Sequence, residues 1–116
     1  MANSYVRYIA DSEYETKERG VSTSVVSVNT YLTRINPDGD NYTGLTLANG
    51  VRPGQLKKII IFNTDAATTT TITVENLQGG NTITINNDTL GNGVNLVWTG
   101  IVWAPNELLE TTITTV

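Results

Sequence analysis

The chain has 116 residues and a net charge of −4, with 39% hydrophobic and 16% charged side chains, which fits one folded domain and excludes a second. The absence of Cys and His excludes disulfides, thiol chemistry, imidazole bases and ordinary zinc sites. An acidic chain has no electrostatic footprint for a phosphate backbone, so no nucleic acid is expected as a partner, and no apolar stretch is long enough for a signal peptide or a membrane span.

Residues 1–20 are predicted to form an N-terminal arm, ahead of a single β domain at residues 21–116. Tyr5, Tyr8 and Ile9 in this arm are apolar or amphipathic side chains of the kind that dock on a neighbouring subunit or partner. The same pattern also suits a first strand of the chain's own sheet. Both interpretations are compatible with the sequence.

The end of the arm and the start of the domain differ in pattern. Residues 11–19 are predicted to be a solvated charged loop rather than a short helix, because Gly20 would stop a helix at once. From 21 to 35 the apolar positions change parity twice, which predicts either two strands joined by a bend or one strand with a bulge. Residues 36–41 form a compact polar loop pattern, and 43–47 alternate like a strand.

The middle of the chain contains its most apolar run. A Pro-Gly pair at 53–54 fits the central positions of a type II turn. The run that follows, 56–62, ends in four large apolar residues and predicts a central strand buried on both faces. Residues 71–75 and 82–86 alternate Thr with Ile or Val around a Gly-rich turn, which predicts a β-hairpin.

The segment around the two tryptophans supplies the best core candidate. A two-residue turn at 99–100 would pair Trp98 with Ile101, and both would face the core. Val97 and Val102 would then be paired on the opposite face. Two valines on the outside of a Thr- and Asn-rich sheet would be covered either by another element of this chain or by another subunit.

A closing strand is predicted at 111–116, where every residue is β-branched. Together with the turns that recur roughly every 8 to 12 residues, these patterns predict an all-β fold. We expect a single-domain β-sandwich or jelly-roll-like barrel of about eight to ten short antiparallel strands.

Few residues point to chemistry. The serines have no His to activate them, and the carboxylate pairs Asp38/Asp40 and Glu107/Glu110 lie in loop-like segments where solvation is favoured over glycoside hydrolysis. The loop at 38–41 gathers oxygen ligands suited to Ca²⁺ but lacks the EF-hand pattern, so an ordinary turn is favoured. We therefore expect no enzyme activity, no cofactor and no metal.

A family resemblance rests on five motifs in about half of the chain. They are LTLANG at 45–50, RPGQLKKIII at 52–61, TITV at 71–74, GNTI at 80–83, and VNLVWTG at 94–100 with Trp103. In this order they resemble small β modules of tailed-bacteriophage and other viral structural proteins, found in capsid decoration proteins and in head or tail fibres, commonly as trimers. The motifs carry fold-determining residues, so they bear on architecture more than on role.

The resemblance implies a capsid decoration or cement subunit that binds the outer capsid surface and stabilises the shell. Such a subunit is made in the host cytoplasm, becomes part of the virion, forms a homotrimer and contacts the major capsid protein or another virion protein. Candidate contacts are the arm residues Tyr5, Tyr8 and Ile9, together with Val97 and Val102.

The alternative is a receptor- or carbohydrate-binding fibre or tail module. In that module an exposed aromatic side chain such as Tyr31 or Tyr42 would stack on a sugar ring.

Overall fold

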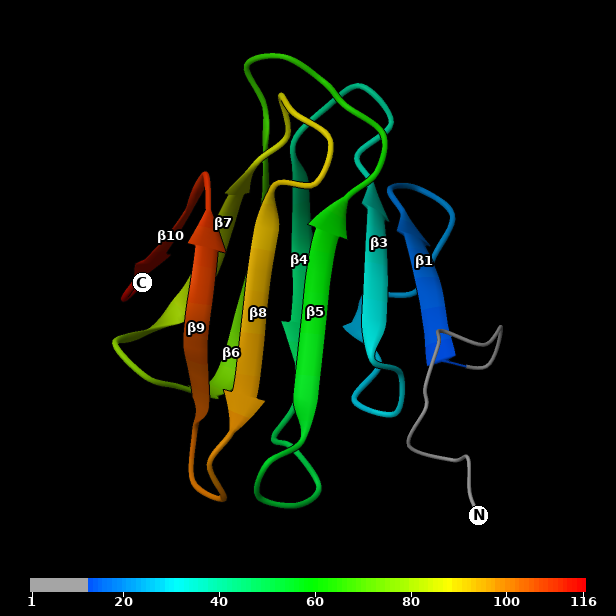
Figure 1. The fold of residues 1–116 in the computed structure, drawn as a ribbon. Helices are drawn as coiled ribbons and strands as arrows, with labels where there is room; N and C mark the ends of the chain where they lie inside the picture. The colour runs from blue at the N-terminus through cyan, green and yellow to red at the C-terminus, as the bar shows by residue number, and fades with distance from the viewer. Residues whose placement is uncertain (1–12) are drawn as a thin grey trace.

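The computed structural model describes residues 13–116, and this part of the chain is all-β, as the alternating patterns predict. It contains ten strands: β1 (Tyr14–Glu18), β2 (Val25–Val26), β3 (Leu32–Asn36), β4 (Tyr42–Leu47), β5 (Leu56–Ile61), β6 (Thr69–Leu77), β7 (Gly80–Asn86), β8 (Gly93–Trp98), β9 (Trp103–Leu109) and β10 (Thr111–Thr114). The strands form a two-layered, barrel-like sandwich (Figure 1).

The two layers are parts of one continuous sheet. One layer, here called sheet I, has the strand order β1-β3-β5-β8-β9, and the other, sheet II, has the order β2-β4-β6-β7-β10. They are joined where Leu77 of β6 pairs with Trp103 of β9. Strands β1 to β6 alternate between the two layers along the chain, so the first half of the domain winds around the core, one strand in each layer per turn. Sheet I is in front in Figure 1.

The winding makes much of the sandwich parallel, which corrects the expectation of antiparallel pairing. Among residues 13–116, five of the nine strand pairings are parallel, including β1 with β3 and β3 with β5. Antiparallel pairing joins β5 to β8, β8 to β9, β6 to β7 and β7 to β10. Parallel neighbours need a crossover between them, and here the crossover is a strand of the opposite layer.

The predicted hairpin and the two-strand interpretation of 21–35 are confirmed. β6 and β7 are joined by a tight turn and pair in antiparallel register, and residues 21–35 contain β2 and most of β3, which lie in different sheets. The expected loop at 11–19 is wrong in its second half, because residues 14–18 form β1 at the edge of sheet I. The last part of the expected arm thus belongs to the sandwich.

The core lies between the two sheets and is built from the inward-facing residues of each strand. Both tryptophans are in it: the rings of Trp98 and Trp103 meet edge to face with centroids 5.4 Å apart, and Trp103 Nε1 donates to the carbonyl of Ala48 at 2.8 Å. The two-residue turn is wrong. Trp98 pairs with Trp103 across a four-residue loop, 99–102, so Ile101 is exposed rather than buried.

The expectation that 56–62 is buried on both faces is correct only in part. β5 is central in sheet I, between β3 and β8. Its inward side chains, including Ile59 and Ile61, are fully buried, whereas Lys58 and Ile60 on the outward face are half-buried. Because β5 alternates between a buried and a half-buried face, sheet I presents its outer surface to the surroundings.

Candidate functional site

An apolar patch lies at the end of the sandwich where β5 begins and β8 ends. Leu56 pairs with Val97, and Val97 pairs with Ala104, so the three side chains form a row on the outer face of sheet I. Two loops at the same end of the sandwich carry further apolar side chains, and we call the row and these residues together the end patch. It comprises Val51, Pro53, Leu56, Val97, Ile101, Val102 and Ala104.

The largest side chains of the end patch are exposed. The exposed fraction is 53% for Leu56, 67% for Val51 and 77% for Ile101. The charged side chain among the patch loops is Arg52, which is exposed at the rim. Several large apolar side chains that are exposed at one end of a small domain are typical of a surface that another macromolecule covers.

Hydrogen bonds hold the two loops of the end patch together. The backbone N–H of Gly54 donates to the carbonyl of Trp98 at 2.7 Å, and the N–H of Trp98 donates to the carbonyl of Gln55 at 2.8 Å. The N–H of Gln55 donates to the carbonyl of Arg52 at 3.2 Å, with Gly54 at φ 89°, as the predicted type II turn requires. The patch is therefore a fixed surface, with little conformational freedom to lose on binding.

The predicted contact residues fall in two places. Val97 and Val102 both lie in the end patch and are half-buried, but they are not paired with each other, because Val97 pairs with Ala104 and Val102 lies in the loop before β9. Tyr5, Tyr8 and Ile9 lie outside the described residues. Sequence reasoning missed Leu56 and Ile101, because it placed both in a buried strand or core position.

Next to the end patch, the outer face of sheet I carries a small hollow with a mixed polar and apolar lining. It has a volume of about 180 Å³ and is lined by Lys58, Ile60, Gly91, Gly93, Val94, Asn95, Glu107 and Leu109. The side-chain N–H of Asn95 donates to Glu107 Oε1 at 2.6 Å. The other amide atom, Asn95 Oδ1, is buried and has no partner within residues 13–116. The side chains of Lys58, Asn95 and Glu107 line the hollow, but the acceptor of Asn95 that lacks a partner is covered by the protein.

Gly93 forms the floor of this hollow because no other residue fits. A Cβ atom at position 93 would lie 1.9 Å from the carbonyl oxygen of Ile59 in the neighbouring strand.

On the far side of the same face, the Arg34 guanidinium lies 4.8 Å from the ring centroid of Tyr14 and 4.6 Å from that of Phe62. Outward side chains of sheet I are therefore chemically mixed.

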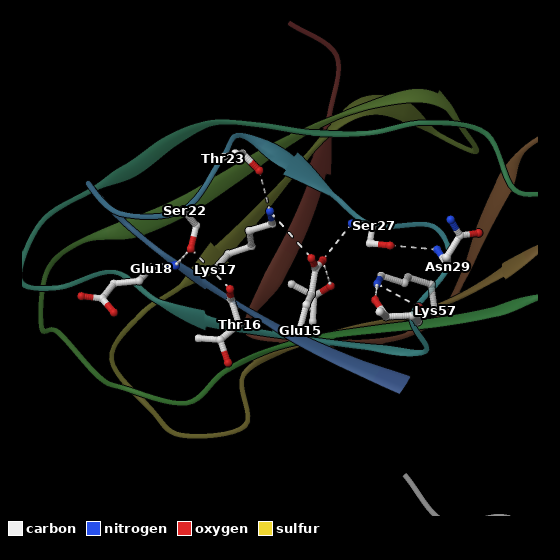
Figure 2. A network of polar contacts seen from close by, with 11 residues as sticks. Glu15, Thr16, Lys17, Glu18, Ser22, Thr23, Ser27, Asn29 and Lys57 are labelled. Atoms are coloured by element: carbon white, nitrogen blue, oxygen red, sulfur yellow. Dashed lines mark hydrogen bonds and ion pairs between the residues drawn. The ribbon is translucent and has the colours of Figure 1, made fainter. Parts of the chain in front are cut away.

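A network of polar side chains lies between the two sheets, around β1, β2 and β3 (Figure 2). Glu15 Oε2 accepts hydrogen bonds from the N–H of Ser27 at 2.8 Å and from the hydroxyl of Thr33 at 2.7 Å. The ammonium of Lys17 lies 3.7 Å from Glu15 Oε1 and donates to the hydroxyl of Thr23 at 3.1 Å. These groups form their hydrogen bonds and ion pair within the protein. The network therefore connects β1 with β3 and with the segments on either side of β2.

Lys57 is the most buried charged group next to the network, with 1% of its surface exposed. Its ammonium donates to the carbonyl of Thr30 at 3.0 Å and to the Thr30 hydroxyl at 2.9 Å. Burial lowers the pKa of Lys57 from 10.5 to about 8; the carboxylate of Glu15 opposes this shift, and the charge of Lys17 adds to it. The fold thus accommodates a buried ammonium group, although removing its charge from water costs free energy.

The expectation that Glu107 lies in a loop-like segment is wrong, because Glu107 is an exposed residue of β9. The other chemical candidates from the sequence lie in turns or in the core. At the loop 36–41 the N–H of Asp38 donates to Oδ1 of Asn36, as in an ordinary Asx turn, and the N–H of Asn41 donates to the carboxylate of Asp40. Residues 13–116 contain no group of three or more Asp and Glu side chains placed to hold a metal ion. Tyr42 is buried, with its hydroxyl unpartnered, so stacking of this ring on a sugar is excluded, whereas Tyr31 is half-buried.

Within the described residues, no helix has the length and apolar character that crossing a membrane requires. Comparisons with known proteins add no identification. No family model, no curated protein and no solved structure matches this chain.

Proposed function

We propose that this protein is a structural subunit of a virus particle, a decoration or cement protein that binds the outer capsid surface. The observation that supports this proposal is the end patch, a fixed apolar surface on a small acidic β-sandwich. Its exposed Leu56, Val51 and Ile101 are the kind of side chains that a neighbouring subunit buries. The sequence motifs at 45–61 and 94–103, which resemble viral β modules, build the loops and strands of this patch.

Such a subunit would act by mass action. A protein that binds the assembled shell but not its free parts shifts the equilibrium toward the shell, by about 2.7 kcal/mol per site when its free concentration is 100 times the dissociation constant. A second copy of the chain would cover part of the same patch, which is how a homotrimer would form.

The test is a charge placed in the patch. Leu56→Asp and Ile101→Asp should each abolish co-sedimentation with shells assembled from a candidate major capsid protein, and should lower the native mass to that of a monomer. Leu90→Asp is the matched control, since Leu90 is exposed to a similar extent in a loop far from the patch. A wild-type chain that is monomeric at high concentration and does not bind shells would refute the proposal.

A carbohydrate-binding module is a second candidate, and the hollow on sheet I favours it. Its lining includes Lys58, Asn95 and Glu107, whose side chains are of the donor and acceptor types that bind the hydroxyls of a sugar ring. Specific hits on a glycan array that disappear in Asn95→Ala and persist in Leu56→Asp would favour this function over capsid decoration.

A further inference from the structure

Two asparagines of this chain are followed by glycine, Asn49 before Gly50 and Asn92 before Gly93. In such a pair the backbone nitrogen of the glycine can attack the side-chain carbonyl carbon of the asparagine, because glycine has no side chain to obstruct the approach. One pair lies in the loop between β4 and β5, and the other lies where β8 begins. The surroundings of each pair therefore determine whether it can react.

Asn92 is held in a way that prevents the reaction. It is buried, with 1% of its surface exposed, and its Nδ2 donates to the carbonyl of Asn86 at 2.9 Å and to Asp88 Oδ1 at 3.2 Å. Gly93 lies between β5 and β9 and pairs with a residue of each strand. Its nitrogen therefore cannot turn toward the side chain of Asn92 without breaking the sheet, and the amide that would have to leave is bound.

Asn49 is free of these restraints within residues 13–116. It is half-buried, and its side-chain oxygen accepts a hydrogen bond from Asn76 Nδ2 at 2.9 Å. Its own Nδ2, the group that would leave, has no partner in this part of the chain, and neither has the backbone nitrogen of Gly50, the group that would attack. The hydrogen bond from Asn76 also draws electron density from the carbonyl carbon, which favours attack on it.

Packing explains why glycine stands at position 50. A Cβ atom there would overlap the indole ring of Trp98, so a bulkier residue, which would slow the reaction, does not fit. On the other side of Asn49, the carbonyl of Ala48 accepts the side-chain N–H of Trp103 at 2.8 Å. Asn49 thus lies between two residues that contact the core tryptophans, and the loop that follows it belongs to the end patch.

We propose that Asn49 is a site of spontaneous deamidation that alters the end patch as the protein ages. The nitrogen of Gly50 forms a bond to Cγ of Asn49, the bond from Cγ to Nδ2 breaks, and the departing nitrogen takes the proton from Gly50 and leaves as ammonia. Water then opens the cyclic imide at either of its two carbonyl carbons, which gives aspartate or isoaspartate at position 49. The reaction needs no reactant other than water.

Both products change the surroundings of the loop. Each adds a negative charge near Glu75, whose Oε1 accepts the backbone N–H of Asn49 at 3.1 Å. Isoaspartate also inserts one more carbon atom into the backbone between Ala48 and Gly50, which are both held against the core tryptophans. The longer backbone should loosen these contacts. The inference concerns the isolated chain, so it does not rest on the proposed function.

The test is peptide mapping of the full chain after incubation at mildly alkaline pH. Trypsin separates the two pairs, because residues 35–57 carry Asn49 and residues 59–116, which contain no Lys or Arg, carry Asn92. In the folded chain, Asn49 should gain one dalton and become a substrate for isoaspartyl methyltransferase at least about tenfold faster than Asn92, a difference of about 1.4 kcal/mol in activation free energy. In guanidinium chloride the two asparagines should react at similar rates, because unfolding removes the protection of Asn92.

Asn49→Gln is the matched variant, because its longer side chain keeps the amide but closes a six-membered ring far more slowly. The deamidated fraction of the wild type, isolated by anion exchange, should melt at a lower temperature and show altered tryptophan fluorescence, whereas Asn49→Gln incubated in the same way should show neither change. Equal rates at the two asparagines in the folded chain overturn the proposal. A deamidated fraction that melts like the unmodified protein overturns it too.

Discussion

The buried Lys57 should make the stability of this protein rise with pH, and replacing it should remove that rise. Below about pH 8 the amine is charged in both the folded and the unfolded chain. Between about pH 8 and 10.5 it is neutral in the folded chain, where burial lowers its pKa to about 8, and still charged in the unfolded one. The unfolded state then binds more protons, so the free energy of unfolding increases with pH.

The size of the increase follows from the two pKa values. A difference of about 2.5 between them corresponds to about 3 kcal/mol, and most of it, about 2 kcal/mol, is reached between pH 7 and 10. Above pH 10 the trend reverses, since burial raises the pKa of Tyr42 and the unfolded tyrosine ionises first. Lys57→Met should abolish the rising limb while equalling or exceeding the wild-type stability at pH 7.

Urea titrations at pH 7, 8, 9 and 10, followed by fluorescence of the two buried tryptophans, measure this. Lys58→Met is the control, because Lys58 is the next residue of β5 and faces outward. Lys58→Met removes the same formal charge, but from the outer face of the sheet rather than from the buried interior. Parallel pH profiles for wild type and Lys57→Met would refute the reasoning, because the burial of the amine would then carry no cost.

Three further predictions concern stability. Trp103→Phe should lower the free energy of unfolding by about 1 to 3 kcal/mol in urea, since it leaves the carbonyl of Ala48 without its donor; an unchanged midpoint would contradict this. Gly93→Ala should lower the melting temperature more than any exposed substitution, because its Cβ would overlap the carbonyl of Ile59; wild-type melting would show that β5 and β8 can separate freely. Tyr42→Phe should be neutral or stabilising by about 1 kcal/mol, because the buried hydroxyl has no partner, and it should remove the loss of stability above pH 10; that loss persisting would assign it to another group.

Periodicity was sufficient to predict most of the strands and most of the core, but it missed β1 and most of β9. The Thr/Ile alternation of β6 and β7 specified the hairpin, and Trp98 and Trp103 were placed correctly in the interior. Alternation has the same period in parallel and antiparallel strands, so it could not reveal that β1 to β6 wind through both layers. Direction depends on which strands become neighbours, and that choice is made by contacts between residues 18 to 28 positions apart.

The errors at the candidate site have local causes. The hydroxyl of Thr99 accepts the N–H groups of both Ile101 and Val102, at 3.2 Å and 3.1 Å, which stabilises a four-residue loop where Thr-Gly suggested a two-residue turn. The burial of Lys57 follows from its place in a strand expected to be buried, but its partner, Thr30, was missed because it lies 27 residues earlier in the chain. Neither contact leaves a periodic signal.

The polar network has a consequence for how this protein opens. Its Glu15, Lys17 and Thr33 occupy inward positions that elsewhere in the sandwich hold Ile or Leu. If β1 detaches from β3, water meets Glu15, Lys17 and Thr33, which it can solvate, and the core residue that loses its neighbour in β1 is Ile35. We therefore expect β1 to unfold locally at a low cost in free energy. Its amide hydrogens should exchange with solvent before those of β5 to β8. Local unfolding of β1 would therefore expose mainly polar groups, which do not favour aggregation.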